Sequence, residues 1–258
     1  MPGLLYSVNH WEILNEPDPS DPFWLGFLVG EEKEYFDILK NSYEAIKQAD
    51  SNAVIFHAGG YQRSYWQSIY SMGGKNYFDV ANFHMIRSNI KYLLNTCTSL
   101  AKFLKDNQIT HWWMSEFGVD GSIDQPDEVA INTLKGNVIA LAHGAEKTFH
   151  AVYKAPPSIF MSMEQFMVTA MIDGNDNPKP LFHTMKTMME KIDAFSEVQI
   201  ISDTEYKFIV NDKPVYVVWE SNELPVEFAK NKSLKLTNYL GRTYNIKSED
   251  FKFSLWIS

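Results

Sequence analysis

Short apolar runs alternate with longer amphipathic runs over the first three quarters of the chain. The apolar runs predict strands at His10–Leu14, Ala53–His57, Phe78–His84, His111–Ser115 and Thr148–Tyr153. The amphipathic runs predict helices at Glu32–Ala49, Asn89–Asn107, Asp127–His143 and Pro180–Phe195. The predicted strands are apolar at nearly every position, as in a parallel sheet that helices cover. The alternation therefore predicts an α/β fold built on parallel strands.

The pattern changes after about residue 195. Segments such as "EYKFIVND" and "KPVYVVWES" are short strand-like runs, separated by Asp, Asn, Gly and Pro, and they show no helical period. Such a pattern is typical of a small antiparallel β domain. We therefore expect two domains, an α/β domain at 1–193 and a C-terminal antiparallel β domain at 194–258.

Composition narrows the classes of partner. The chain has 258 residues, 45% of them hydrophobic, and its formal net charge is −9. No Lys/Arg cluster is present to neutralise phosphates, so we expect no nucleic-acid partner. No apolar run approaches the roughly 18 residues of a membrane span. The first residues, MPGLLYSVNHW, do not read as a secretory signal, and the compartment stays open.

Cysteine and histidine usage argues against a metal centre. The single cysteine, Cys97, excludes an internal disulfide framework and a Cys-based zinc site. The seven histidines show no HExxH-type spacing. We therefore expect no metal ion and no cofactor.

Two acids lie where the chemistry of a parallel α/β sheet is usually found. Glu16 follows the first predicted strand, and Glu116 follows the fourth. The carboxyl ends of parallel strands lie at one end of the sheet, so we expect both acids on the same side. Two facing carboxyl groups, one protonated and one ionised, are what glycosidic bond cleavage requires.

The segments "WEILNEPD" and "WWMSEFG" resemble the two signature segments of a large clan of retaining glycoside hydrolases that are built on a (β/α)8 barrel. The resemblance implies that Glu16 is the general acid/base at the end of barrel strand four. It implies that Glu116 is the nucleophile at the end of strand seven. Asn15 matches the residue that hydrogen-bonds the sugar 2-hydroxyl, and His84 matches the polar residue at the end of strand six.

In fold, the resemblance implies a partial TIM (β/α)8 barrel, strands four to eight, followed by a small antiparallel β domain. Trp24 and Tyr153 are candidate platforms for stacking on the apolar face of a sugar ring. Lys154 stands where the clan often has Trp, which departs from the usual aromatic floor. Only nine residues precede His10, so strands one to three have no counterpart in this sequence.

Three hypotheses follow from these features. The first is a retaining glycosidase, in truncated or split form, that cleaves β-linked oligosaccharide or polysaccharide. The second is a non-catalytic carbohydrate-binding or structural remnant of a glycosidase. The third is one component of a two-chain enzyme, in which the missing half-barrel comes from a separate chain or from self-association.

Overall fold

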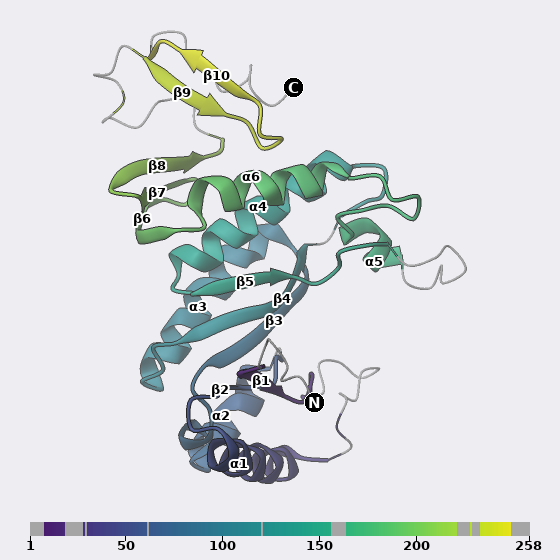
Figure 1. The fold of residues 1–258 in the computed structure, drawn as a ribbon, viewed down its shortest axis with the longest axis vertical. Helices are drawn as coiled ribbons and strands as arrows, with labels where there is room; N and C mark the ends of the chain where they lie inside the picture. Colours follow the sequence, from purple (N-terminus) through teal and green to yellow (C-terminus); the bar gives the residue numbers. More distant parts are fainter. Residues whose placement is uncertain are drawn as a thin grey trace, which may run out of the picture. The chain divides into compact units, whose positions relative to one another are not determined.

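The computed structural model describes residues 8–18, 28, 30–60, 62–119, 121–155, 164–220, 228 and 233–248 (Figure 1). The strands are β1 His10–Ile13, β2 Val54–His57, β3 Ala81–Ser88, β4 Trp112–Val119, β5 Lys147–His150, β6 Phe195–Ser202, β7 Glu205–Val210, β8 Lys213–Val218, β9 Leu234–Thr237 and β10 Thr243–Ile246. The helices are α1 Glu32–Ala49, α2 Arg63–Ser71, the short 3₁₀ helix η1 Gly74–Tyr77, α3 Ile90–Asp106, α4 Pro126–Ala142, α5 Glu164–Thr169 and α6 Pro180–Ile192.

The predicted α/β alternation is confirmed, and α1 has the predicted bounds. Helices α2 and α5 were not predicted, because each is too short to display a clear helical period. Strands β3 and β4 each run beyond the predicted C-terminal end. Among the helices that the structure describes, none combines the length and apolar character that a membrane crossing needs.

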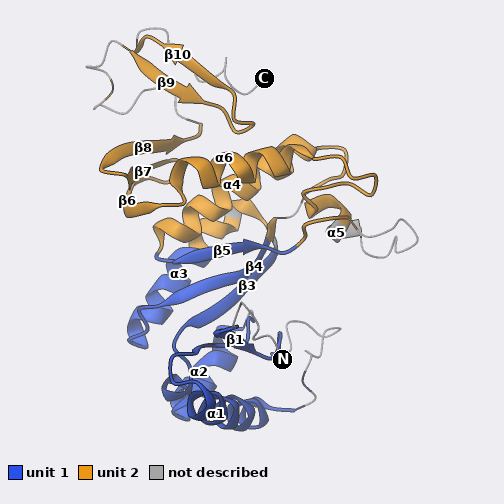
Figure 2. Cartoon of the chain, in the orientation of Figure 1, with its two compact units in different colours: residues 1–86, 96–117, 144–151 blue, residues 87–95, 118–143, 152–258 orange. Residues whose placement is uncertain are grey.

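The chain divides into two compact units (Figure 2). One comprises residues 1–86, 96–117 and 144–151, and the other comprises 87–95, 118–143 and 152–258. The first unit contains β1, β2 and β5 with helices α1 and α2, together with most of β3 and β4. The acids discussed below, Glu12, Glu16 and Glu116, and their neighbour His84 belong to this first unit.

Parallel pairing organises the first unit. Strand β1 pairs with β2 in parallel register, from His10 opposite Val54 to Ile13 opposite His57. A parallel bridge between Phe56 and Val80 follows, and the next sheet has the order β3-β4-β5, with β4 and β5 parallel. The strands thus succeed one another in chain order, as repeated βα units produce.

Helices α1 and α2 bury one side of the first strand pair. The Tyr35 hydroxyl donates to the carbonyl of Ile13 at 3.3 Å and accepts the N–H of Ala58 at 2.7 Å. The ring of His57, on β2, stacks on Trp66 of α2 with centroids 4.1 Å apart. Tyrosine and histidine therefore tie both strands to the helical layer.

The expectation that the first strand is a buried apolar strand is wrong. Only Ile13 of β1 is buried, while Trp11 is 44% exposed and Glu12 is also exposed. The cause is that β2 is the only strand that pairs with β1 among the described residues, so one edge of β1 has no ladder.

The second unit combines helices with antiparallel sheets. Helix α4 packs on α6, where the side-chain amide of buried Asn137 on α4 lies 3.9 Å from the sulfur of buried Met185 on α6. Strands β6, β7 and β8 form an antiparallel sheet in that order, and β9 pairs with β10, also antiparallel. The last of the predicted helices therefore ends at Ile192, and antiparallel pairing begins at Phe195.

Candidate active site

The chain leaves β1 through an unusual turn. Leu14 has φ of 66° and Glu16 has φ of 40°, a left-handed region that costs free energy for residues other than glycine. The N–H of Glu16 donates to the carbonyl of Gly59 at 3.0 Å, and this bond anchors the turn to the end of β2. The turn thereby holds the Glu16 side chain, which is 11% exposed, inside the site.

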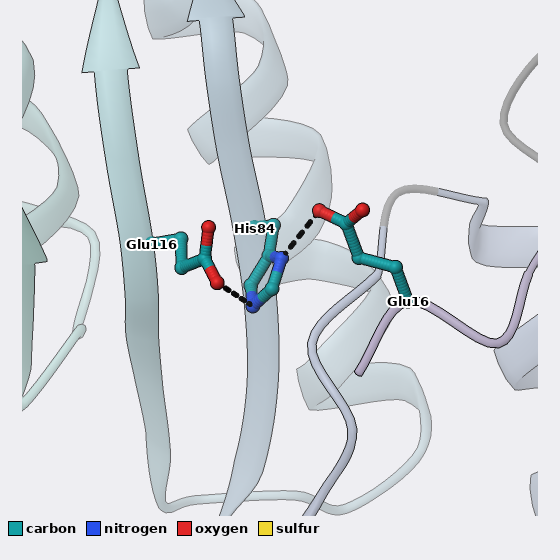
Figure 3. Close-up of side chains that lie close together, drawn as sticks. All are labelled: Glu16, His84 and Glu116. Carbon is teal, nitrogen blue, oxygen red and sulfur yellow. Dashed lines mark hydrogen bonds and ion pairs between the residues drawn. The ribbon is translucent and has the colours of Figure 1, made fainter. Parts of the chain in front are cut away.

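His84 lies between the two predicted catalytic acids (Figure 3). Its Nδ1 atom is 2.8 Å from Oε1 of Glu16, and its Nε2 atom is 3.9 Å from Oε1 of Glu116. The imidazole side chain is fully buried. Because an ionised carboxylate only accepts hydrogen bonds, Nδ1 carries the proton in the pair with ionised Glu16.

A second polar pair fixes the other side of the imidazole. Nε2 of His84 is 3.0 Å from Oγ of Ser115, which in turn accepts the side-chain amide of Asn82 at 2.7 Å. The Asn82 carbonyl oxygen accepts the N–H of Ser115 at 3.1 Å, which sets the orientation of the amide. The Ser115 hydroxyl can donate to a neutral imidazole or accept from an imidazolium, so the site accommodates His84 in either charge state.

A close backbone approach confines the same ring. A Cβ atom on Gly59 would lie 1.9 Å from Nε2 of His84 and 2.0 Å from Cδ2. Gly60 is also closely packed, because its Cβ would lie 2.5 Å from Oδ1 of Asp18. The consecutive glycines after β2 thus allow the backbone to approach both side chains closely.

The two acids lie close together around the imidazole. One oxygen of Glu16, one oxygen of Glu116 and a ring nitrogen of His84 are all within 4.8 Å of one another. Burial raises the pKa of the Glu116 carboxyl, the nearby His84 lowers it, and the charges of Glu16 and Glu12 raise it further. The pKa of Glu116 is therefore subject to opposing effects, of which burial is the largest. The Glu116 side chain is 37% exposed.

The same three side chains offer oxygen and nitrogen donors, which divalent cations accept. However, the contact between Nδ1 of His84 and Glu16, at 2.8 Å, is a hydrogen bond. In a tetrahedral zinc site, two ligand atoms bound to the same ion lie about 3.3 Å apart or more, which is longer than this contact. We therefore interpret Glu16, His84 and Glu116 as a proton-sharing network.

Of the predicted site residues, the structure brings Glu16, His84 and Glu116 together. The expected positions of two of them within their strands are wrong, because Glu116 lies inside β4 and His84 inside β3, rather than at the strand ends. Asn15 is partly exposed, and within the described part of the chain its amide forms no hydrogen bond.

Two predicted sugar-stacking residues have different outcomes. Trp24 lies outside the described residues. Tyr153 belongs to the second unit, three residues after β5 ends, and its side chain is 63% exposed. The roles of both residues stay predictions.

Four residues of the site were missed: Glu12, Gly59, Asn82 and Ser115. Strand alternation offered a signal for Asn82, which is two residues before His84 and so shares its face of β3. Glu12 lies in the segment "WEILNEPD" itself, four residues before Glu16. The contacts of Gly59 and Ser115 are long-range and have no local pattern.

Comparison with known proteins gives similarity at the level of structure alone. No family model matches the sequence, and no curated protein matches it. A glucosidase from Croceicoccus marinus superposes with a TM-score of 0.60 at 9% identity, covering 95% of this chain and 56% of that one. A monomeric β-xylosidase from Caulobacter crescentus CB15 gives a TM-score of 0.53 at 12% identity, covering 87% and 51% respectively.

These similarities establish that the chain shares an α/β fold with glycosidase structures. A GH39 β-xylosidase from Caulobacter crescentus, with a TM-score of 0.50 at 12% identity, covers 76% of this chain and 44% of its own length. The chain therefore spans about half the length of the structures that it resembles.

Proposed function

We propose that this chain carries the catalytic pair of a retaining glycoside hydrolase that cleaves β-glycosidic bonds. The observation that supports the proposal best is the arrangement of Glu16 and Glu116 around His84, with carboxylate oxygens within 4.8 Å. Retaining enzymes place their two carboxyl groups about 5–5.5 Å apart, whereas inverting enzymes keep them about 6.5–9.5 Å apart to admit a water molecule.

In the first step, protonated Glu16 gives its proton to the glycosidic oxygen. An ionised oxygen of Glu116 bonds to the anomeric carbon as the bond to the leaving group breaks. In the second step, Glu16 takes a proton from water, whose oxygen bonds to the anomeric carbon and releases Glu116. The two inversions give net retention of configuration.

The surroundings of Glu116 suit the role of nucleophile. Nε2 of His84 lies 3.9 Å from Oε1 of Glu116, and this neighbour lowers the pKa of the Glu116 carboxyl. It thereby counters the effect of burial and favours the ionised nucleophile. We assign Asn15 to the sugar 2-hydroxyl, and Trp24 and Tyr153 to stacking on the sugar ring.

We also propose that β1 to β5 correspond to strands four to eight of a (β/α)8 barrel, within a domain at 1–193. Residues 194–258 then form a separate antiparallel β domain. The parallel pairing of β1 with β2 and of β4 with β5 supports the first part. The antiparallel pairing of β6, β7 and β8 supports the second.

Completion of the barrel requires further βα units, from a separate chain, from self-association or from a longer form of this protein. The exposure of β1 and β5, where Trp11 and Phe149 are each 44% exposed, supports this proposal. Sedimentation of the purified chain separates these cases, because self-association gives a dimer at micromolar concentration. If the purified chain stays monomeric, the further βα units come from a separate chain or from a longer form of this protein.

Azide rescue of a catalytically complete form, acting on an aryl β-glycoside, tests the assignment of the two acids. Glu116→Ala should abolish turnover, and azide should restore it as an α-glycosyl azide, because the anion attacks the face that the nucleophile vacates. Glu16→Ala should accumulate glycosyl-enzyme, which azide releases as a β-glycosyl azide. Glu44→Ala, an exposed change on α1, is the control.

The same azide anomer from both variants would contradict the assigned roles. Unchanged turnover in Glu116→Ala would contradict the function itself. For the 258-residue chain alone we expect little or no turnover, because without the remaining barrel wall the site does not exclude water or hold the sugar.

A further inference from the structure

Glu12 is an acid of the site that the proposed mechanism does not use. Its Oε1 atom accepts the N–H of Gly59 at 2.8 Å. The carbonyl of the same Gly59 accepts the N–H of Glu16 at 3.0 Å. A single residue, 47 positions from Glu12 in the chain, therefore joins the two acids through its two backbone polar groups.

The Glu12 carboxylate also lies against the imidazole. Its Oε1 atom is 3.8 Å from Nε2 of His84, and Oε1 of Glu116 is 3.9 Å from the same nitrogen. Gly59 packs so closely on the His84 ring that a methyl group there would overlap the ring atoms. A substitution of Glu12 can thus affect Glu16 and Glu116 in two ways. It can move the Gly59 backbone, and it can change the charge near the imidazole.

We infer that Glu12 is a positioning residue, whose ionised carboxylate holds Gly59 against His84 and adds a negative charge beside Glu116. The inference rests on the proposed function for its catalytic meaning. It extends that function by assigning the site a third carboxylate, which touches neither of the reacting bonds.

The charged and titratable groups around Glu12 come from four parts of the first unit. Glu16 follows β1, His84 is on β3, Glu116 is on β4 and Tyr35 is on α1. Tyr35 stays neutral, because burial raises its pKa further above an already high value. Within the described residues, the ion pairs of Glu12 and Glu116 are with His84 alone.

The direction of the effect on Glu116 follows from these charges. Burial is the main cause of the raised pKa of Glu116, His84 opposes it, and Glu16 and Glu12 add to it. Removal of the Glu12 charge should therefore favour ionised Glu116. The two carboxylates share one neighbouring nitrogen, so their facing oxygens are no more than about 8 Å apart. Even at the dielectric constant of water, loss of one charge at that distance changes the ionisation ratio about twofold.

The test is an NMR titration of the intact chain with carboxyl-¹³C glutamate, in which Glu116→Gln identifies the Glu116 signal. Glu12→Gln keeps an oxygen that accepts the Gly59 N–H but removes the charge. At the wild-type midpoint, its ratio of ionised to protonated Glu116 should rise at least about twofold. Glu12→Asp, which keeps the charge, and Glu44→Gln, which removes an exposed charge on α1, should leave the midpoint near that of wild type.

An unchanged or higher midpoint in folded Glu12→Gln would overturn the inference. If that variant does not fold, the amide proton of Gly59 in the wild-type chain provides the measurement. Its chemical shift should follow the titration of Glu116, and Glu116→Gln should remove that step. A Gly59 chemical shift that does not change between wild type and Glu116→Gln would overturn the inference equally.

This experiment measures charge coupling in the folded chain and needs no turnover, so its outcome is separate from that of azide rescue. In a catalytically complete form the coupling has a kinetic consequence. The acid limb of kcat/KM should move to lower pH in Glu12→Gln, because the nucleophile stays ionised further into acid. A role of Glu12 in packing alone would lower the plateau value of kcat/KM without moving the acid limb of its pH profile.

Discussion

Gly59→Ala is the most severe small substitution that the site offers. The added Cβ would lie 1.9 Å from Nε2 of His84, 2.0 Å from Cδ2 and 2.6 Å from Cε1. Ordinary contact needs about 3.5 Å, so the imidazole must move by more than 1 Å. The buried ring is held by Glu16 at 2.8 Å and by Ser115 at 3.0 Å, and such a movement breaks both hydrogen bonds.

The magnitude follows from two costs. Overpacking of a tight site costs about 1–3 kcal/mol, and loss of the hydrogen bonds around a buried polar ring adds about 1 kcal/mol or more. We therefore expect Gly59→Ala to lower the free energy of unfolding by about 2–4 kcal/mol. For a chain of this size, that lowers the melting temperature by about 5–15 °C.

Urea unfolding followed by circular dichroism and tryptophan fluorescence measures this cost. Gly174→Ala is the matched control, because its Cβ meets nothing within 4 Å, and its stability should stay within about 1 kcal/mol of wild type. The same substitution in a His84→Ala background should cost no more than about 1 kcal/mol, since the ring is gone. Equal costs of Gly59→Ala in both backgrounds, or a cost under 0.5 kcal/mol in wild type, would refute the reasoning.

Two further predictions concern buried polar groups of the first unit. Tyr35→Phe removes the acceptor of the buried Ala58 N–H and the donor to the Ile13 carbonyl, so the free energy of unfolding in urea should fall by about 1–3 kcal/mol. Tyr43→Phe, which removes no hydrogen bond of the described residues, is the control and should change it little. Burial lowers the pKa of His57 from 6.5 to about 3, so between these pH values the unfolded chain binds more protons than the folded chain. The free energy of unfolding that His57 contributes is therefore present above pH 6.5 and is lost as the pH falls toward 3. Unfolding measured from pH 7 to pH 4 should show wild type losing up to about 1.4 kcal/mol per pH unit more than His57→Gln, and parallel curves would contradict this prediction.

The local sequence predicted most of the longer elements, and it singled out the two acids as candidates. Helix α1 has its predicted bounds, because its helical period and the capping box of Glu31 and Glu34 depend only on neighbouring residues. Glu16 and Glu116 were selected because acids at the ends of apolar runs are visible without any long-range contact.

Tertiary structure determined where strands β3 and β4 end and which residues of β1 are buried. Strands β3 and β4 run past their predicted ends, where the hydrophobic pattern had indicated a stop. The Asn82 amide and the Ser115 hydroxyl and N–H satisfy one another between these strands, so polar side chains are accommodated inside the sheet. Among the described residues β1 pairs with β2 alone and most of its side chains are exposed, which no local pattern of residues reports.

Tertiary structure alone also joined the acids to their partners. Glu16 and His84 are 68 positions apart in sequence, and Glu12 and Gly59 are 47 apart. The glycine had the appearance of a simple loop residue, and Glu12 that of an ordinary polar position in a strand. Their importance comes from a distance of a few ångströms between separate strands, and periodicity and residue type carry no information about such distances, because they describe only a residue's neighbours along the chain.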